Sequence, residues 1–270
     1  MGDIVNYLLT LMNDTVDSPV SSGRRVQRVR HDIVRRELAV RRVEALSPHV
    51  RAITLGGAAL AGFTSLSFDD HVKLFFAPVQ PGEEGARRDY TPRRYDPIAQ
   101  ELTLEFALHG DGPAAAWAAQ AEVGQALTVA GPRGSFIIPS DYDWHLLIGD
   151  ETALPAIARR LEELPAGTRV IALLLMPDAA DRRPLQTSAD LQLQWLDSEA
   201  ALLAALRALE LPAGEGYAWC AGEAGCMAAL RRVLVEEKGH DRQALRAAAY
   251  WKRGASGHHE ALEDAPPPAA

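Results

Sequence analysis

The sequence predicts two folds in succession: an antiparallel β-barrel of six strands, followed by a doubly wound parallel sheet. In the first half of the chain, short runs of alternating apolar residues are separated by turn residues, which is typical of a small barrel. After Pro139-Ser140-Asp141 the runs become continuously apolar and alternate with helical patterns, which is typical of a parallel sheet buried on both faces. The 270 residues are enough for two domains of ordinary size.

The barrel strands are predicted from the period of their apolar residues. The pattern becomes β-like at Glu37, and the remaining strands cover residues 50–55, 71–76, 88–95, 101–108 and 126–130. The stretch 101–108 alternates cleanly and places its apolar residues on one face. One helix, at residues 113–120, interrupts the series directly after Gly110-Asp111-Gly112.

The parallel sheet is predicted from apolar runs that alternate with helices. The strands cover 144–148, 169–176, 191–196 and 217–221, and the helices cover 153–164, 199–209 and 224–237. Residues 245–251 fit either the tail of a helix or a final strand. Such sheets bind ligands at the carboxyl ends of their strands, so the loops at 149–153 and 222–223 are candidates. The first loop lacks the G-x-G-x-x-G fingerprint of a Rossmann dinucleotide site.

The composition bounds the class of function. A net charge of −8 argues against a general nucleic-acid binder, and basic residues are instead concentrated at 24–42 and 87–94. No apolar run is long enough to span a membrane, and the apolar residues 4–12 lack the flanks of a signal peptide. The two cysteines make no disulfide framework, which fits a reducing cytoplasm.

Both ends of the chain are predicted to lie outside the folded domains. Residues 1–30 are expected to be a variable lead-in that finishes in a solvated basic arm. Residues 258–270 are expected to form a disordered tail, because 261–270 is rich in Pro and Ala. We predict no metal site at His258-His259-Glu260, since no further ligand-rich segment lies nearby in sequence.

The segment Arg88-Asp89-Tyr90-Thr91-Pro92-Arg93 carries the clearest chemistry. A planar aromatic can stack on a flat ring, and a neighbouring hydroxyl can donate to a ring nitrogen. Arginines at both ends can bind phosphate oxygens through two hydrogen bonds each. One extended segment can therefore hold both ends of a phosphorylated ring cofactor. On residue chemistry alone, an edge strand with a solvated basic face explains this short pattern better.

A second candidate is the junction between Gly112 and the helix that begins at Pro113. The start of a helix exposes unpaired N–H groups and the positive end of the helix dipole, and glycine lets a phosphate approach closely. Proline suits the first helical position. An ordinary loop-to-helix entry would show the same Gly-x-Gly-Pro pattern.

The chain resembles the siderophore-interacting proteins, a branch of the ferredoxin-reductase-like flavoproteins. Segment 88–93 looks like the flavin motif of that family, and further matches follow in the family's order at 109–118, 131–135, 143–156 and 250–254. The resemblance implies an FAD-binding barrel domain over 31–140 and an NAD(P)H-binding-like α/β domain over 141–257. It favours a final strand at 245–251 that brings Tyr250 and Trp251 back toward the flavin.

The resemblance implies a role for each residue of an FAD site. Tyr90 would stack on the isoalloxazine ring and Thr91 would hydrogen-bond near its N5 atom, so these two are the candidate catalytic residues. Arg88 and Arg93 would engage the phosphate or ribityl side, and the helix start would bind the pyrophosphate. The remaining implied contacts to FAD or to the electron donor are His109, Gly112, Ala114, Ala115, Glu151 and Thr152. His109 could instead be a strand-end histidine, and Cys220 is as compatible with an inert buried residue as with a nicotinamide contact.

The implied activity is that of an FAD-dependent ferric-siderophore reductase in the cytoplasm, with NADPH or NADH as the electron donor. Its anionic iron chelate would be attracted by cations that could also be plain surface residues: Lys73, Arg133, Lys252 and Arg253. The sequence does not choose between the two donors, because exposed arginines are common on helices and loops and four of them could also reach the 2′-phosphate of NADPH: Arg159, Arg160, Arg182 and Arg183. Two alternatives are a reductase that works with a ferredoxin- or flavodoxin-type electron carrier, and a non-enzymatic siderophore-binding protein.

Overall fold

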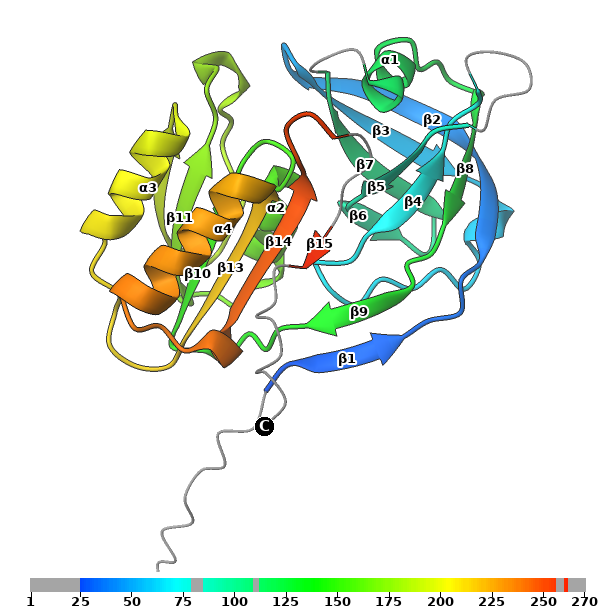
Figure 1. Ribbon diagram of the computed structural model, residues 1–270. Helices are drawn as coiled ribbons and strands as arrows, with labels where there is room; N and C mark the ends of the chain where they lie inside the picture. The colour runs from blue at the N-terminus through cyan, green and yellow to red at the C-terminus, as the bar shows by residue number, and fades with distance from the viewer. Residues whose placement is uncertain (1–24, 79–84, 109–111, 256–259, 262–270) are drawn as a thin grey trace, which may run out of the picture.

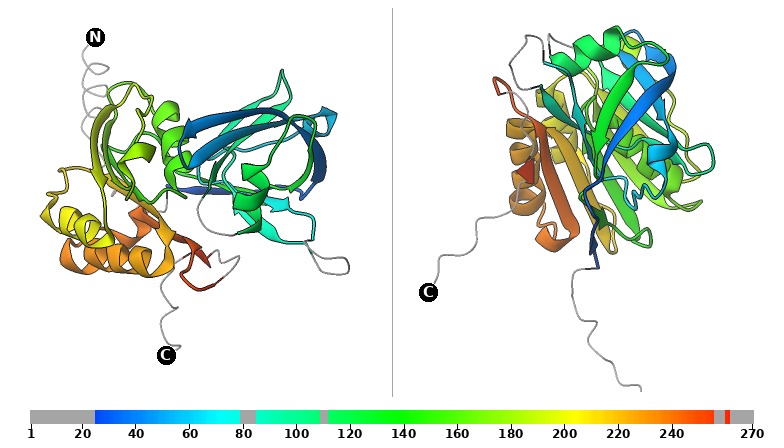
Figure 2. Two further views of the ribbon diagram at one scale, coloured as in Figure 1. Left: turned by 90° about the horizontal axis from the view of Figure 1, so that it is seen from above. Right: turned by 90° about the vertical axis from the view of Figure 1, so that its right-hand side faces the viewer.

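The computed structural model describes residues 25–78, 85–108, 112–255 and 260–261. Figure 1 shows two lobes side by side, a lobe of β-strands with one short helix from the first half of the chain and an α/β lobe from the second half. Figure 2 shows the same two lobes from above in its left view and from the right-hand side in its right view. The predicted fold class, a barrel followed by a parallel α/β sheet, is confirmed. The predicted boundary at 139–141 lies in the link between the lobes.

Seven antiparallel strands form the barrel sheet, in the spatial order β5-β4-β8-β2-β3-β7-β6. Apolar residues point into the barrel at every second position, because strand side chains alternate between the two faces. In β7, Leu102, Leu104 and Phe106 are fully buried for this reason. The strands are β2 (Arg35–Ser47), β3 (Val50–Gly56), β4 (Val72–Phe75), β5 (Arg87–Tyr90), β6 (Arg94–Asp96), β7 (Glu101–Ala107) and β8 (Ala126–Ala130).

The predicted fourth barrel strand, 88–95, is two strands in the structure. β5 ends at Tyr90 and β6 begins at Arg94, and the two lie at opposite edges of the sheet. Pro92 interrupts the ladder because it has no N–H group to donate. The four Cα steps from Tyr90 to Arg94 span at most about 14 Å. The sheet must therefore curl until its edges are neighbours, and the segment that contains Thr91 crosses the seam of the barrel.

A two-stranded sheet outside the barrel was not predicted. β1 (Gln27–Arg30) pairs antiparallel with β9 (Gly134–Ile137), and the Arg28 guanidinium lies 5.3 Å from the centre of the Phe136 ring. Just before β1, Arg25 forms ion pairs with Asp141 and Glu215. In the basic arm that the sequence predicts to be solvated, Arg25 is therefore paired with carboxylates and the backbone is paired with a strand edge, while Arg28 and Arg30 are exposed.

The α/β lobe contains five parallel strands in the order β12-β11-β10-β13-β14, and β15 is added antiparallel at one edge. Residues 245–251 form a strand, so the second of the two alternatives is correct. With β10 at the centre, the chain winds outward in both directions, which is the doubly wound pattern. The strands are β10 (Trp144–Gly149), β11 (Arg169–Leu175), β12 (Asp190–Leu196), β13 (Gly216–Glu223), β14 (Leu245–Trp251) and β15 (Glu260–Ala261).

The two faces of the parallel sheet are covered differently. α3 (Glu199–Ala208) and α4 (Ala224–Arg232) pack on one face, over Leu146 and Ile148 of the central strand. α2 (Leu154–Glu163) covers the other face together with the barrel lobe, whose Phe68 is buried in the same apolar core. The barrel thus covers surface that a helix would otherwise cover, and Phe68 joins it to the core of the α/β lobe, while the interior of the barrel holds a core of its own.

The remaining elements are short. They are α1 (Pro113–Ala119), three 3-10 turns, η1 (Ala58–Leu60), η2 (Ala179–Asp181) and η4 (Arg242–Ala244), and a π-helical turn, η3 (Val233–Glu237). The predicted helix at 224–237 is therefore α4 continued by a π-helical turn. Among the helices of the described ranges, none has the length and apolar character needed to cross a membrane.

Candidate functional site

A cleft of about 430 Å³ lies between the two lobes. The barrel lines it with β5, β7 and the start of α1, and the α/β lobe lines it with the turn after β10 and the end of β14. Figure 1 shows β14 on the side of the parallel sheet that faces the barrel. The cleft brings together eight of the ten predicted cofactor and donor contacts: Arg88, Tyr90, Thr91, Gly112, Ala114, Ala115, Glu151 and Thr152.

Tyr90 and Thr91 lie in the cleft where β5 ends. The Tyr90 ring packs against Phe106, with 4.4 Å between the ring centres, and burial raises the pKa of its hydroxyl, so the phenol stays neutral. Thr91 is 7% exposed, and its hydroxyl forms a hydrogen bond with the hydroxyl of Tyr250 from β14. The planar ring of Tyr90 and the hydroxyl of Thr91 are therefore neighbours at the seam of the barrel, and Phe106 packs against the Tyr90 ring.

The start of α1 faces the same cleft. Gly112 precedes the helix with an ordinary φ of −70°, and no atom of the described residues lies within 4 Å of the point where a Cβ would sit. The backbone therefore does not require glycine at this position. Ala114 and Ala115 lie in the first turn of the helix, where N–H groups have no partner within the helix. Among the described residues, the arrangement leaves open space beside N–H groups that have no partner within the helix.

The carboxyl edge of the parallel sheet supplies the opposite wall. Glu151 and Thr152 follow β10, and Tyr250 and Trp251 complete β14. Burial, together with the charge of Asp150, raises the pKa of Glu151 to about 7. Sequence analysis did not single out Asp150, which is 3% exposed and accepts hydrogen bonds from Thr152, Glu223 and Trp251. The Gly-Asp-Glu-Thr order after an apolar strand is the signal that marks it.

The two flanking arginines of the segment separate. Arg88 lines the cleft, but Arg93 is not among the described residues that do. The Arg93 guanidinium instead pairs with Glu105 at 3.1 Å and with Glu162 of α2 at 2.5 Å. These contacts favour a tie between the lobes over a phosphate contact, because two carboxylates already occupy the guanidinium. Sequence reasoning could not see Glu105 and Glu162 as partners, since they are distant along the chain.

The four cations predicted to attract a chelate lie outside the described lining of the cleft. Lys73 is paired with Asp89 of the neighbouring strand at 2.6 Å, and Arg253 is paired with Glu199 at 2.8 Å. Their side chains are still 45% and 73% exposed, so both remain accessible to a ligand. Lys252 and Arg133 are also exposed. Substrate binding by these four residues stays a prediction.

Other predicted residues are engaged elsewhere or lie outside the description. Arg159 donates to Ser65 and to the carbonyl of Pro92, and Arg160 donates to the carbonyl of Pro139. Arg182 donates to the carbonyl of Met176, and Arg183 pairs with Glu105. These four arginines therefore tie segments of this chain together, and a 2′-phosphate would have to compete with those contacts. His109 and the segment 258–259 lie outside the described residues.

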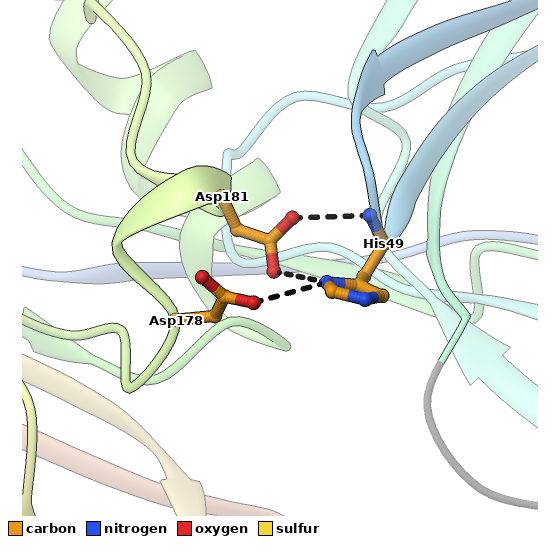
Figure 3. Close-up of side chains that lie close together, drawn as sticks. All are labelled: His49, Asp178 and Asp181. Carbon is orange, nitrogen blue, oxygen red and sulfur yellow. Dashed lines mark hydrogen bonds and ion pairs between the residues drawn. The ribbon is translucent and has the colours of Figure 1, made fainter.

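A cluster of His49, Asp178 and Asp181 lies at a different contact between the lobes (Figure 3). Asp181 accepts hydrogen bonds from Ser47 Oγ at 2.7 Å and from His49 Nδ1 at 2.9 Å. Asp178 accepts from the N–H of Ala180 and so begins the turn η2. Both carboxylates thus accept hydrogen bonds from residues of this chain. The bonds to Asp181 connect the β2–β3 turn to the α/β lobe.

The barrel, the parallel sheet and the shared cleft define the class of FAD- and NAD-binding reductase folds. The FAD/NAD-binding domain of nitric oxide dioxygenase from Vibrio cholerae superimposes with a TM-score of 0.62 at 18% identity, covering 78% of this chain and 96% of that one. The model of the siderophore-interacting FAD-binding domain matches residues 39–84 and 77–136, and the siderophore-interacting protein model matches 142–254. The chain belongs to the siderophore-interacting protein family, and its cofactor is FAD.

Individual relatives agree with this family. The NADPH-dependent ferric-chelate reductase of Escherichia coli K12 is 42% identical over 245 residues, which cover 83% of this chain and 96% of that protein. Ferric vibriobactin reductase ViuB of Vibrio cholerae is 30% identical over 79% of this chain and 88% of that protein. The siderophore utilization protein from T. fusca has a TM-score of 0.81 at 35% identity, covering 86% of this chain and 98% of that one.

Proposed function

We propose that the protein is an FAD-dependent ferric-siderophore reductase that takes electrons from NADPH and releases iron as Fe(II). The observation that carries the proposal is the cleft, because a barrel segment with a ring and a hydroxyl faces the carboxyl edge of the parallel sheet across it. That edge is where sheets of this type bind nucleotides. The two relatives named as ferric reductases support this assignment.

The residues of the cleft fit an FAD molecule. Tyr90 offers a flat, neutral ring, Thr91 offers a hydroxyl beside it, and Arg88 is a cation in the lining. The N–H groups at the start of α1 suit a pyrophosphate, and the space beside Gly112 leaves room for it. When bound, FAD accepts a hydride from a nicotinamide and passes electrons one at a time to Fe(III).

The α/β lobe serves the electron donor in this proposal. Thr152 and Glu151 lie at the carboxyl end of β10, and Trp251 lies at the end of β14 on the same wall. These side chains would orient the nicotinamide and exclude water from it. The choice of NADPH over NADH rests on the name of the relative from Escherichia coli. Because NADPH is held inside the cell, we place the reaction in the cytoplasm.

The substrate is proposed to be an anionic ferric chelate that docks at the mouth of the cleft. The exposed cations Lys73, Arg133, Lys252 and Arg253 would attract it to a chain with a net charge of −8. Electron transfer to the chelate does not require a closely fitting pocket. Reduction frees the iron because Fe(II) binds hard oxygen donors less tightly than Fe(III) does.

An anaerobic experiment tests the proposal. The purified protein is loaded with FAD and mixed with NADPH, and flavin bleaching is followed by absorbance. A ferric siderophore is then added, and return of the flavin absorbance together with trapping of Fe(II) by a ferrous chelator is the expected result. A protein that does not take up FAD, or a reduced flavin that the chelate does not reoxidise, would refute the proposed function.

The two alternatives are outcomes of the same experiment. A reductase that serves an electron carrier would be reoxidised faster by a ferredoxin or a flavodoxin than by the chelate. Ferredoxin reductases are among the matched structures at 17% and 21% identity, a level that shows the fold alone. A siderophore-binding protein without activity would bind the chelate and leave NADPH unoxidised.

A further inference from the structure

Asp150 is a buried carboxylate on which three segments of the cleft wall converge. Its Oδ1 accepts from the N–H of Thr152 at 3.0 Å and from the Thr152 hydroxyl. Its Oδ2 accepts from the N–H of Glu223 at 3.0 Å and from the indole N–H of Trp251 at 2.8 Å. These donors come from the turn after β10, the end of β13 and the end of β14. One side chain therefore joins the carboxyl ends of three parallel strands.

The surrounding chain is shaped for a carboxylate at this point. Gly222 has a φ of +151°, and a Cβ on it would lie 2.5 Å from Asp150 Oδ2, so only glycine lets the carboxylate approach the strand end. Within the part of the chain that the structure describes, the two oxygens accept from four donors. An asparagine would present an NH₂ group to two of those donors in either orientation, so only a carboxylate accepts all four bonds.

The contact with Trp251 links this buried group to the cleft. Trp251 and Thr152 both line the cleft, whereas Asp150 lies behind them and does not. Trp251 ends β14, and the chain turns there through Lys252 and Arg253. The indole can rotate about its own side-chain bonds unless a partner holds it. Asp150 is the partner that the structure provides.

We infer that Asp150 is a positioning residue for the electron donor: it fixes Trp251, Thr152 and the Gly222–Glu223 turn as one wall against which the nicotinamide is oriented. The inference rests on the proposed function and concerns only the step in which NADPH gives its hydride to the flavin. The step in which electrons leave toward the ferric chelate uses the exposed mouth of the cleft and does not depend on this wall.

The same strand offers a control for the change of charge at its other end. Asp143 precedes β10 and accepts a hydrogen bond from the N–H of Glu215 at 2.7 Å. It lies beside Gly214, whose φ is +98° and whose Cβ would sit 2.3 Å from the Asp143 carboxylate. Asp143 thus repeats the aspartate–glycine–glutamate arrangement far from the cleft. Because Asp143 is exposed and Asp150 is buried, Asp143→Asn controls for the loss of a carboxylate charge at an end of the same strand, and not for burial.

The test separates the two half-reactions by stopped-flow absorbance. In Asp150→Asn loaded with FAD, we expect reduction by NADPH to slow about 10- to 100-fold, because small misplacements of a reacting group have effects of this size. Reoxidation of the dithionite-reduced variant by a ferric siderophore should keep its wild-type rate. Trp251→Phe removes one hydrogen bond to Asp150 and keeps an aromatic ring. It should also slow the reduction of the flavin by NADPH. Asp143→Asn should change neither rate.

A second readout needs no cofactor. In the apoprotein, Asp150→Asn should speed amide hydrogen exchange at Thr152 and Glu223, and Trp251→Phe should reproduce part of that change at Glu223. Equal losses in both half-reactions, or an unchanged rate of reduction, would overturn the inference. Should Asp150→Asn fail to fold, a Trp251→Phe protein that is reduced at the wild-type rate would overturn the inference. A wild-type protein that is not reduced by NADPH would refute the proposed function instead.

Discussion

At position 112, glycine keeps space open in the cleft, and the backbone conformation does not require it. Its φ of −70° is open to any residue, and no described atom lies within 4 Å of the place that a Cβ would take. We predict that Gly112→Val lowers the unfolding free energy of the apoprotein by no more than about 1 kcal/mol, because glycine is preferred over valine at a helix N-cap. FAD affinity should fall at least about tenfold, because the new methyl groups occupy space proposed for the pyrophosphate.

Fluorescence titration of the apoprotein with FAD measures this effect, and urea unfolding measures the stability. Gly112→Ala is the graded control and should lie between wild type and the valine variant. Normal FAD affinity in a folded Gly112→Val protein would remove the helix start from the cofactor site.

Glu151 gives the site a pH dependence. Burial and the neighbouring Asp150 raise the pKa of Glu151 to about 7, above the value of about 4.5 expected in the unfolded chain. The unfolded state then ionises first as pH rises, so Glu151 costs stability above pH 4.5 and reaches its full cost above pH 7. Glu151→Gln should therefore raise the unfolding free energy at pH 8 by about 1–3 kcal/mol.

Urea unfolding of the apoprotein at pH 5 and pH 8 checks the sign. The gain from Glu151→Gln should be smaller at pH 5, where the native carboxyl group is protonated. The exposed Glu122 supplies the control, since Glu122→Gln should give no such difference between the two pH values. A loss of stability at pH 8 would contradict the prediction.

At the scale of elements, the break between β5 and β6 decides what the flanking arginines do. Arg93 lies in this break and pairs with Glu105 of β7 and Glu162 of α2, so it joins a barrel strand to a helix of the other lobe. Arg159 of α2 donates to the carbonyl of Pro92 at 2.9 Å. Helix α2 therefore contacts Pro92 and Arg93, the two residues that follow Thr91.

We predict that Arg93→Gln lowers the unfolding free energy of the apoprotein by about 2–4 kcal/mol, because it leaves the buried Glu105 with one cation fewer. FAD affinity should change less than about threefold if the guanidinium serves only this tie. The neighbouring exposed Arg94 is the control, and Arg94→Gln should leave stability unchanged. Unchanged stability together with much weaker FAD binding would instead show that Arg93 contacts the phosphate of FAD.

At the scale of the whole molecule, the cleft is lined by residues of both lobes, so its shape depends on the contacts that hold the lobes together. Asp181 contributes at the contact away from the cleft, where it is 1% exposed and accepts from Ser47 and His49. Burial works to raise the pKa of Asp181, but these hydrogen bonds outweigh it and hold the pKa below its ordinary value. The stabilisation is therefore present above the unfolded-state pKa and is lost as pH falls through the folded-state value.

We predict that Asp181→Asn lowers the unfolding free energy by about 1–3 kcal/mol at pH 7, because it removes charge-assisted hydrogen bonds from a buried group. The difference from wild type should shrink as the pH is lowered through 4, and urea unfolding over that range measures it. Asp178, which is 51% exposed, offers the comparison, and Asp178→Asn should cost less. A constant difference at all pH values would show that the carboxylate charge plays no part.

Much of this architecture could be predicted from local patterns. The alternation in 101–108 is the same pattern that buries β7, and the apolar run 144–148 is the centre of the parallel sheet. The pairing of Tyr90 with Thr91 and the glycine before α1 pointed to the residues that line the cleft. The seventh barrel strand was missed because one proline divides a continuous β-like segment, and β1 was missed because its partner strand lies over a hundred residues away.

The sequence by itself determined the order of the two folds, the family and most of the cleft-lining residues, because these depend on neighbours within a few positions. Only the tertiary structure decided which charges are paired and which face a ligand. Arg93 and Arg88 are five residues apart in the same motif, yet one is held by carboxylates of two lobes and the other lines the cleft. Asp150 likewise becomes a junction of three strands only through the register of a folded sheet, since its donors lie two, 73 and 101 residues away.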